Sequence, residues 1–239
     1  MNSELEIQKL NPNMPNKGGG QEIDMYKLCA FDMDGTFVNS LGDIAAAMNR
    51  ALVKLGFDEY PTDAYKKMVG SGMTVLCKRA LPNADDAAVE KLVAEYNADY
   101  LKNCCVKTAP YDGMVELAKH LKDSGAKCVI LSNKPHQQAC EIAEKIIPGG
   151  LFDEILGKTE RFPIKPAPDS LLYLMDKFGV TKTETAYVGD SDVDIKLGKA
   201  ADVFTVGVSW GFRGEDELLS AGAQAVAHTP SELEKILMR

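Results

Sequence analysis

Short apolar runs alternate along the chain with longer segments whose apolar residues recur at the spacing of an α-helix. Apolar runs of about four to eight residues are typical of strands buried on both faces of a parallel sheet. The segments between them are predicted to be helices that cover such a sheet. The pattern therefore predicts an α/β fold with a Rossmann-like parallel sheet. Five strands are predicted: Tyr26–Phe31, Lys127–Leu131, Thr185–Val188, Val203–Val208 and Ala225–Ala227.

Capping residues and glycines mark the ends of the predicted helices. Glycine often ends a helix because it adopts the left-handed conformation at little cost. The last helix has the clearest beginning, with Thr229 as N-cap, Pro230 as first helical residue and Glu232 as partner in a capping box. Three earlier helices have an apolar face that ends before a glycine: residues 44–55 before Gly56, 114–121 before Gly125 and 171–178 before Gly179.

The interval between the first two predicted strands, about residues 42–108, contains no strand-like run and has breaks near Pro61 and Pro82. A crossover between parallel strands needs only about a dozen residues, so this interval is interpreted as an inserted α-helical cap domain above the sheet. The α/β core then consists of residues 25–41 and 109–239. The packing face of the cap is predicted to contain Val89, Leu92, Val93, Tyr96 and Leu101.

The composition indicates an ordinary globular protein behind a flexible extension. Residues 1–24 are rich in turn formers, so they are expected to be flexible and to precede a functional start at Met25. The formal net charge of −8 disfavours nucleic acid and anionic membranes as partners. The six cysteines lack metal-finger spacing and are expected to be buried free thiols. With no leader or membrane-length apolar run, a cytoplasmic monomer or homodimer is expected.

Acidic residues follow two of the predicted strands. Asp32 and Asp34 come directly after the first, and a cluster at 190, 192 and 194 follows the run that ends at Val188. Carboxylates held close together resist ionisation unless a cation or a division of acid and base roles relieves the repulsion. The acid pair therefore predicts a metal site, catalytic chemistry or both.

Anion-binding groups are predicted at two other places. Ser132 and Asn133 follow another strand and lead into a probable helix, where a hydroxyl and backbone N–H groups can hold an anion. Taken alone, a serine before a helix is more often only a cap, and that interpretation of Ser132 is favoured in isolation. Lys165 lies among prolines 163, 166 and 168, which restrict its backbone. A lysine on such a restricted backbone is suited to hold a positive charge against a phosphate. Most single lysines, however, are solvated surface charges.

Ligands of open α/β sheets bind beyond the carboxyl ends of the strands, so these groups are expected to converge. Together they fit a phosphoryl-transfer site, with acids for Mg²⁺, donors for phosphate and a carboxylate nucleophile. A calcium loop is excluded because Ile195 and Ala201 replace its glycine and final glutamate. A nucleotide P-loop and a Gly-x-Ser-x-Gly hydrolase motif are absent from the sequence, which leaves the three histidines as surface or cap residues.

The chain resembles the haloacid dehalogenase superfamily from about residue 25 to 239. It matches the four motifs of that family in order, with a helical cap after the first: Asp32-x-Asp34-Gly35-Thr36, Ser132, Lys165 and Gly189-Asp190-x-x-x-Asp194. Further segments resemble the phosphoglycolate phosphatase branch: Asp43–Leu52, Val69–Gly72, Pro110–Gly113, Ser132–Pro135 and Val208–Gly211.

The resemblance implies a Mg²⁺-dependent hydrolase of a small phosphorylated metabolite. Asp32 would be the nucleophile that forms an aspartyl-phosphate, and Asp34 the general acid and base. Mg²⁺ would be held by the Asp32 carboxylate, the Asp34 carbonyl and Asp190, with Asp194 supporting it directly or through water. The phosphoryl oxygens would be bound by Ser132, the backbone N–H of Asn133, and Lys165.

Two departures from the branch are visible: Asn39 stands where aspartate is more common, and Ser132 where threonine is common. The serine keeps the hydroxyl, whereas Asn39 removes a charge just outside the first motif. Neither change is expected to affect the core chemistry.

Several alternatives remain at this stage. A β-phosphoglucomutase is disfavoured because no histidine occurs between residues 41 and 110, and a phosphonate hydrolase because Asp34 is intact. A phospho-receiver domain or a non-catalytic phosphate-binding protein represents a different class. The substrate is expected to be 2-phosphoglycolate, with other small phosphomonoesters or pyrophosphate still open. Candidate cap cations for its carboxylate are Arg50, Lys66, Lys67 and Arg79.

Overall fold

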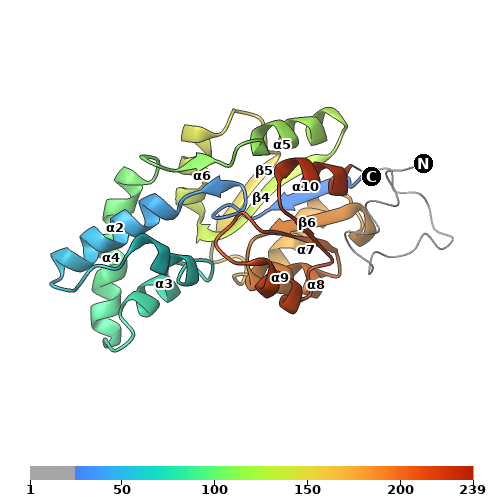
Figure 1. Ribbon diagram of the computed structural model, residues 1–239. Coiled ribbons are helices and arrows are strands. Elements are labelled where there is room, and N and C mark those ends of the chain that lie inside the picture. The colour runs from blue at the N-terminus through green and yellow to red at the C-terminus, as the bar shows by residue number, and fades with distance from the viewer. Residues whose placement is uncertain (1–24, 239) are drawn as a thin grey trace.

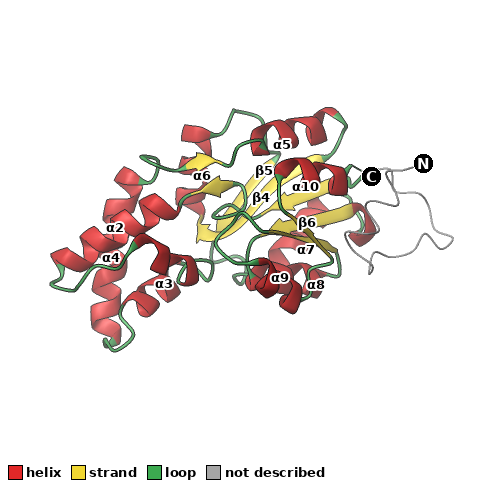
Figure 2. Cartoon of the chain, in the orientation of Figure 1, coloured by secondary structure: helices red, strands yellow, loops and turns green. Residues whose placement is uncertain are grey.

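The computed structural model describes residues 25–238, so the extension predicted for residues 1–24 lies outside the described residues. Six parallel strands form the central sheet in the order β5-β4-β1-β6-β7-β8 (Figures 1 and 2). This arrangement confirms the predicted α/β fold. The strands are β1 Leu28–Phe31, β4 Lys127–Pro135, β5 Glu154–Lys158, β6 Thr185–Gly189, β7 Phe204–Val208 and β8 Ala225–Ala227.

The five predicted strands all occur, and one strand of the sheet was missed. All four residues of β1 are buried, as expected for a strand that pairs on both sides and is covered on both faces. The missed strand, β5, has the sequence Glu-Ile-Leu-Gly-Lys and pairs only with β4 at the edge of the sheet. Because two apolar residues between charged ends give little periodic signal, sequence pattern alone does not identify it.

Helices cover both faces of the sheet. On one face the core contains residues of α7 Asp169–Phe178 and α8 Asp192–Ala201, and on the other residues of α5 Met114–Asp123, α6 His136–Ile146 and α10 Pro230–Leu237. Figure 1 shows α5 and α10 above the strands and α7 and α8 below them. A further helix, α9 Glu215–Ala221, packs against β7.

The predicted start of α10 is largely confirmed. The Thr229 side chain accepts a hydrogen bond from the backbone N–H of Glu232. Only half of the capping box forms, because the Glu232 carboxylate accepts from the backbone N–H of His228 instead of Thr229. The extra bond fixes the residue before the cap, so the helix still begins where predicted.

The interval of about residues 42–108 is helical, as predicted. It contains α2 Leu41–Lys54, the 3-10 helix η1 Thr62–Lys67, α3 Met73–Ala80 and α4 Asp86–Asn103, which form the left part of Figure 1. Two short strands, β2 Val38–Asn39 and β3 Ala109–Pro110, pair antiparallel where the chain leaves and re-enters the sheet. The division into core and cap domains remains a prediction.

The packing face of α4 differs slightly from the predicted set. Val89, Leu92 and Tyr96 are buried, as expected, whereas Val93 and Leu101 are only partly covered. Tyr100 is fully buried in place of Leu101. Residues 89, 92, 96 and 100 follow a strict three- and four-residue spacing, so the helix period favours the tyrosine.

Asp43 joins the two ends of the helical interval. Its carboxylate, only 3% exposed, accepts hydrogen bonds from the backbone N–H of Lys107 at 2.8 Å, and from the N–H and hydroxyl of Thr108 at 2.8 and 2.7 Å. These bonds connect the first turn of α2 to the segment before β3, residues more than sixty positions apart in sequence. The carboxylate thus holds together the two ends of the helical interval, next to the sheet.

Replacing Asp43 with alanine is expected to lower the free energy of unfolding by about 3 kcal/mol, because buried backbone N–H groups lose their acceptor. Chemical denaturation checks this value. The control is Asp63→Ala, whose carboxylate is exposed and paired only with Lys66; it should change stability by no more than about 0.5 kcal/mol. Equal, small effects of both substitutions would contradict the bridging role.

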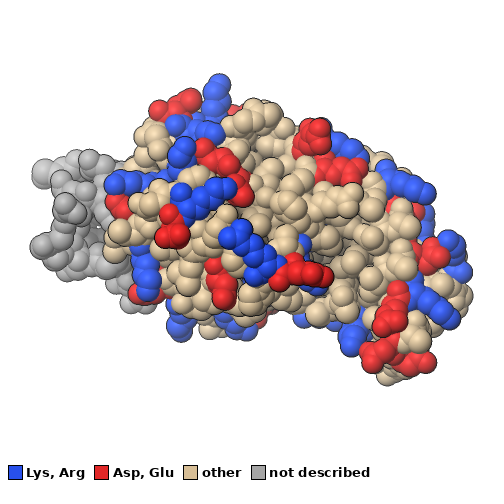
Figure 3. Space-filling view, turned by 180° about the vertical axis from the view of Figure 1, so that it is seen from behind, with Lys and Arg blue, Asp and Glu red and all other residues tan. Residues whose placement is uncertain are grey.

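No helix in the described range 25–238 has the length and apolar character needed to cross a bilayer. Charged side chains of both signs are interspersed over the face shown in Figure 3. All six cysteines are free thiols, as predicted. Four of them are buried, including Cys29 in β1 and Cys128 in β4, whereas Cys105 and Cys140 are only partly buried.

Candidate active site

The predicted site residues come together at the carboxyl ends of β1, β4 and β6, three strands that are neighbours in the sheet. Asp32 and Asp34 follow β1, and Ser132 and Asn133 lie in the last part of β4. Asp190 follows β6. The carboxyl ends of parallel strands share one edge of the sheet, which explains why residues distant in sequence meet there.

Lys165 is the centre of the buried charges. Its ammonium donates to the Asp32 carboxylate at 2.6 Å, to the Asp194 carboxylate at 2.8 Å and to the Tyr187 hydroxyl at 3.1 Å. The lysine is 4% exposed and lies in the proline-flanked loop after β5. It is therefore not a solvated surface charge, which was the alternative left open by the sequence.

Burial and the neighbouring charges act in opposite directions on these groups. Burial raises the pKa of Asp32 to about 7, which the Lys165 charge opposes and the Asp194 charge reinforces. Burial alone would lower the pKa of Lys165, but the charges of Asp194 and Asp32 raise it well above its usual value. The lysine thus stays positively charged, while Asp32 is poised between its two protonation states near neutral pH.

Asp190 completes an acidic cluster that fits a magnesium ion. Asp32, Asp190 and Asp194 each offer a carboxylate oxygen, and these oxygens lie within 4.8 Å of one another. Burial, followed by the charges of Asp194 and Asp32, raises the pKa of Asp190 well above its usual range. Three buried acids beside a single lysine repel one another when they are ionised, which a bound cation would relieve. Carboxylate oxygens are the ligands that Mg²⁺ prefers.

Two glycines allow the backbone to approach Asp190. Gly35 has a φ of +86°, and a Cβ there would lie 2.3 Å from an Asp190 carboxylate oxygen. A Cβ on Gly211 would lie 2.3 Å from the Cβ of Asp190. Any larger residue at either position would displace the carboxylate, so the glycines shape the candidate metal site.

Asp194 is engaged through both carboxylate oxygens. One accepts from Lys165 and Tyr187, and the other accepts from the Ser191 backbone N–H at 3.1 Å and hydroxyl at 2.6 Å. A carboxylate with this many donors is well placed to orient Lys165 and to support a metal through water. The geometry therefore favours the supporting role over direct coordination.

The Asp34 carboxylate has partners different from those of Asp32. One oxygen accepts from the Ser40 hydroxyl at 2.5 Å, and the other lies 3.1 Å from the Lys134 ammonium. Two donors hold the carboxylate in a single orientation beside the pocket. The two acids of the first motif thus have separate environments, as a division of roles requires.

Ser132 and Asn133 both line the same pocket as Asp32 and Asp34. Ser132 lies inside β4, and its hydroxyl accepts a hydrogen bond from the Lys134 N–H at 3.2 Å, so it is not the N-cap of α6. The Asn133 side chain binds the backbone of Lys165 at 2.8 and 3.1 Å, and that of Gly70 at 3.0 Å. Asn133 therefore ties the lysine loop to the helical interval.

A family model described as haloacid dehalogenase-like hydrolase matches residues 29–208. The chain belongs to this family. Two curated proteins named phosphoglycolate phosphatase are similar to it. The one from Haemophilus influenzae (strain Rd) is 33% identical over 195 residues, covering 78% of this chain and 87% of that protein. The one from Aquifex aeolicus is 32% identical over 211 residues, covering 88% and 96%.

Solved structures show that the fold is that of haloacid dehalogenase-like hydrolases. A protein from Lactobacillus delbrueckii subsp. bulgaricus, described as a candidate phosphoglycolate phosphatase, has a TM-score of 0.85 and 29% identity, covering 89% of this chain and 98% of its own. A candidate β-phosphoglucomutase from Bacteroides vulgatus has a TM-score of 0.71 at 19% identity, covering 90% and 88%. The second likeness concerns the fold alone, so it does not separate hydrolase from mutase.

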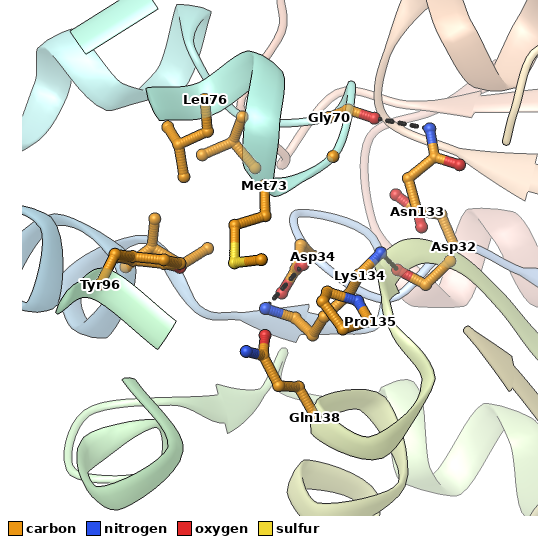
Figure 4. A pocket seen from close by; sticks show the side chains of 14 residues that line it. Asp32, Asp34, Gly70, Met73, Leu76, Tyr96, Asn133, Lys134, Pro135 and Gln138 are labelled. Atoms are coloured by element: carbon orange, nitrogen blue, oxygen red, sulfur yellow. Dashed lines mark hydrogen bonds and ion pairs between the residues drawn. The ribbon is translucent and has the colours of Figure 1, made fainter. Parts of the chain in front are cut away.

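In this haloacid dehalogenase-like hydrolase, the pocket lies between the sheet edge and the helical interval (Figure 4). Its sheet side presents Asp32, Asp34 and the segment Ser132–Pro135. Its helical side is mostly apolar: Ile44, Val69, Gly70, Gly72, Met73, Leu76 and Tyr96. The remaining lining residue, Gln138 of α6, donates to Asn97 of α4 at 2.6 Å and so connects the two sides.

The cationic residues proposed from sequence do not line this pocket. Arg50 pairs with Asp99, Lys66 pairs with Asp63, and Arg79 donates to the carbonyl oxygen of Met68. Lys67 is exposed. The lysine that does line the pocket, Lys134, was missed as a site residue, although it lies two positions after Ser132 and side chains two apart in a strand point the same way.

Proposed function

We propose that this chain is a Mg²⁺-dependent phosphatase that hydrolyses a small phosphomonoester through an aspartyl-phosphate on Asp32. The main observation in support is that the Asp32 carboxylate lies 2.6 Å from the Lys165 ammonium and lines a pocket together with Asp34 and Ser132. A nucleophile, a fixed cation and a second carboxylate with its own partners are what phosphoryl transfer requires.

In the first half of the reaction, an Asp32 oxygen bonds to phosphorus while the bond between phosphorus and the ester oxygen breaks. Asp34 gives its proton to that leaving oxygen, so an alcohol departs. In the second half, Asp34 takes a proton from water, whose oxygen attacks phosphorus. The bond between Asp32 and phosphorus then breaks, which regenerates the carboxylate and releases inorganic phosphate.

The other residues would hold the phosphoryl group during both halves. Lys165, the Ser132 hydroxyl and the Asn133 backbone N–H would bind the phosphoryl oxygens, where charge accumulates in the transition state. Asp32, the Asp34 carbonyl and Asp190 would hold Mg²⁺, whose charge allows the carboxylate and the phosphate dianion to approach each other. Asp194 would keep Lys165 in position.

The first candidate substrate is 2-phosphoglycolate, because the similar curated proteins are named phosphoglycolate phosphatase. Other small phosphomonoesters and pyrophosphate follow. A mutase reaction on sugar phosphates has less support, since the mostly apolar helical side of the pocket offers few partners for sugar hydroxyls. A phospho-receiver or a non-catalytic binding protein has less support, because neither needs a second carboxylate such as Asp34 close to Asp32 to act as general acid and base.

A panel of small phosphate esters tests the proposal. The purified chain is expected to release inorganic phosphate from 2-phosphoglycolate with Mg²⁺ and to lose this activity when a chelator is added. Undiminished turnover in chelator would overturn the metal dependence. An isomerised sugar phosphate as product would indicate a mutase, and absence of turnover across the panel would favour the binding protein.

Magnesium affinity is expected to depend on pH. Metal coordination requires an ionised carboxylate, and the raised pKa of Asp32, about 7, means that the group is largely protonated below pH 7. The raised pKa of Asp190 acts in the same direction. Affinity should therefore rise as pH increases, by at least about tenfold per unit below pH 7. Calorimetric titration at pH 6, 7 and 8 measures it. Equal affinities at pH 6 and 8 would contradict the prediction.

A further inference from the structure

Lys134 is a buried cation that lines the pocket next to Asp34, the residue proposed to protonate the leaving oxygen. It is 7% exposed, and its ammonium lies 3.1 Å from an Asp34 carboxylate oxygen and 2.9 Å from the Tyr100 hydroxyl. It also lies 4.4 Å from the centre of the Tyr100 ring. Figure 4 shows the side chain reaching across the pocket to Asp34, with Met73 on one side and Gln138 on the other.

The ammonium retains a donor for a ligand. A lysine ammonium has three N–H donors, and among the described residues only Asp34 and Tyr100 accept from the ammonium of Lys134. The other buried lysine, Lys165, lies beside the proposed nucleophile Asp32 and is assigned to the phosphoryl oxygens; it also contacts Asp194, Tyr187 and the Leu131 carbonyl oxygen. Lys134 is also the one cation among the described residues that line the pocket.

We propose that Lys134 binds a carboxylate of the substrate and thereby selects phosphate esters of small 2-hydroxy acids. The inference rests on the proposed function and names the substrate class of that same site. In such an ester the carboxylate is attached to the carbon that carries the ester oxygen. Asp34 must reach the ester oxygen in order to protonate it, and Lys134 contacts Asp34. Lys134 is therefore next to the position that the substrate carboxylate occupies in that arrangement.

The rest of the pocket supports a carboxylate over a neutral polar group. Met73, Leu76 and Ile44 form an apolar wall opposite the sheet. A substrate with many hydroxyls would leave some of them unpaired against this wall, whereas a short acid needs one strong partner. A buried ammonium provides that partner, since a charge-assisted hydrogen bond is roughly twice as strong as a neutral one.

The test compares two esters that differ only at this group: 2-phosphoglycolate and 2-hydroxyethyl phosphate, in which a neutral hydroxymethyl group replaces the carboxylate. The measured quantity is the ratio of kcat/KM for the two esters, so any loss common to both cancels. For the unaltered chain the ratio is expected to be roughly 10 to 100, the value of one hydrogen bond to a charged group.

Lys134→Met is expected to reduce the ratio to near one, and Lys134→Arg to retain part of it. The matched control is Lys145→Met, which removes an exposed lysine paired with Glu141; it should leave the ratio unchanged. Thermal denaturation of each variant monitors folding. If Lys134→Met does not fold, the ratio for the unaltered chain and for Lys134→Arg decides the question.

Two results would overturn the inference while leaving the phosphatase intact. One is turnover of both esters by the unaltered chain with a ratio near one. The other is an equal loss on both esters in Lys134→Met, because a lysine that only positions Asp34 affects every ester alike. If the unaltered chain hydrolyses neither ester, nor p-nitrophenyl phosphate, the proposed function fails and the inference fails with it.

Discussion

Replacing Asp32 with asparagine is expected to lower kcat/KM for any phosphate ester by at least about 10⁴-fold, because the variant has no carboxylate to attack phosphorus. The amide is nearly the same size and can still accept from Lys165, which donates to Asp32 at 2.6 Å. The loss should therefore come from chemistry and not from unfolding. Phosphate release at saturating and at low substrate concentration measures it.

The matched control is Asp192→Asn, in the same acidic segment as the candidate metal ligands. Asp192 is partly exposed in the first turn of α8, where its carboxylate pairs with the exposed Lys196. Its replacement should change kcat/KM by less than about twofold, since surface ion pairs contribute little. Comparable activity of Asp32→Asn and the unaltered chain would exclude the covalent mechanism.

The elements that organise this site were predictable because each has a strong local signal. β1 and β6 are buried on both faces and therefore read as continuous apolar runs. The acids at their ends follow directly in sequence, so Asp32 and Asp190 could be placed at one sheet edge without coordinates. The edge strand β5 gave no such signal because few of its residues are buried.

Side-chain partners were harder to predict than positions. Sequence reasoning assigned Lys165 to phosphate but gave no indication that it would lie between Asp32 and Asp194, 133 and 29 residues away. Those contacts depend on how the segments that follow β1, β5 and β6 meet. The pairing of β4 with β5 shifts register between Leu131 and Pro135, the segment that contains Lys134. Lys134 could have been found from its position two residues after Ser132, but the search for cations was confined to the helical interval, which forms the other side of the pocket.

Replacing Lys165 with methionine is expected to destabilise the metal-free chain by about 3–5 kcal/mol and to lower kcat/KM by about 10³-fold. The stability loss arises because the carboxylates of Asp32 and Asp194 remain buried without their cation, at side-chain exposures of 8% and 1%. The activity loss arises because the fixed charge facing the phosphoryl oxygens disappears. Denaturant titration in chelator and steady-state kinetics with Mg²⁺ measure the two effects separately.

A second variant separates burial of charge from catalysis. In Lys165→Met combined with Asp194→Asn, one uncompensated carboxylate is removed, so part of the stability should return while activity stays low. The control Lys177→Met breaks an exposed ion pair with Glu154 and should cost no more than about 1 kcal/mol. Recovery of activity together with stability in the double variant would show that Lys165 acts only by neutralising buried acids and does not contact the phosphoryl group.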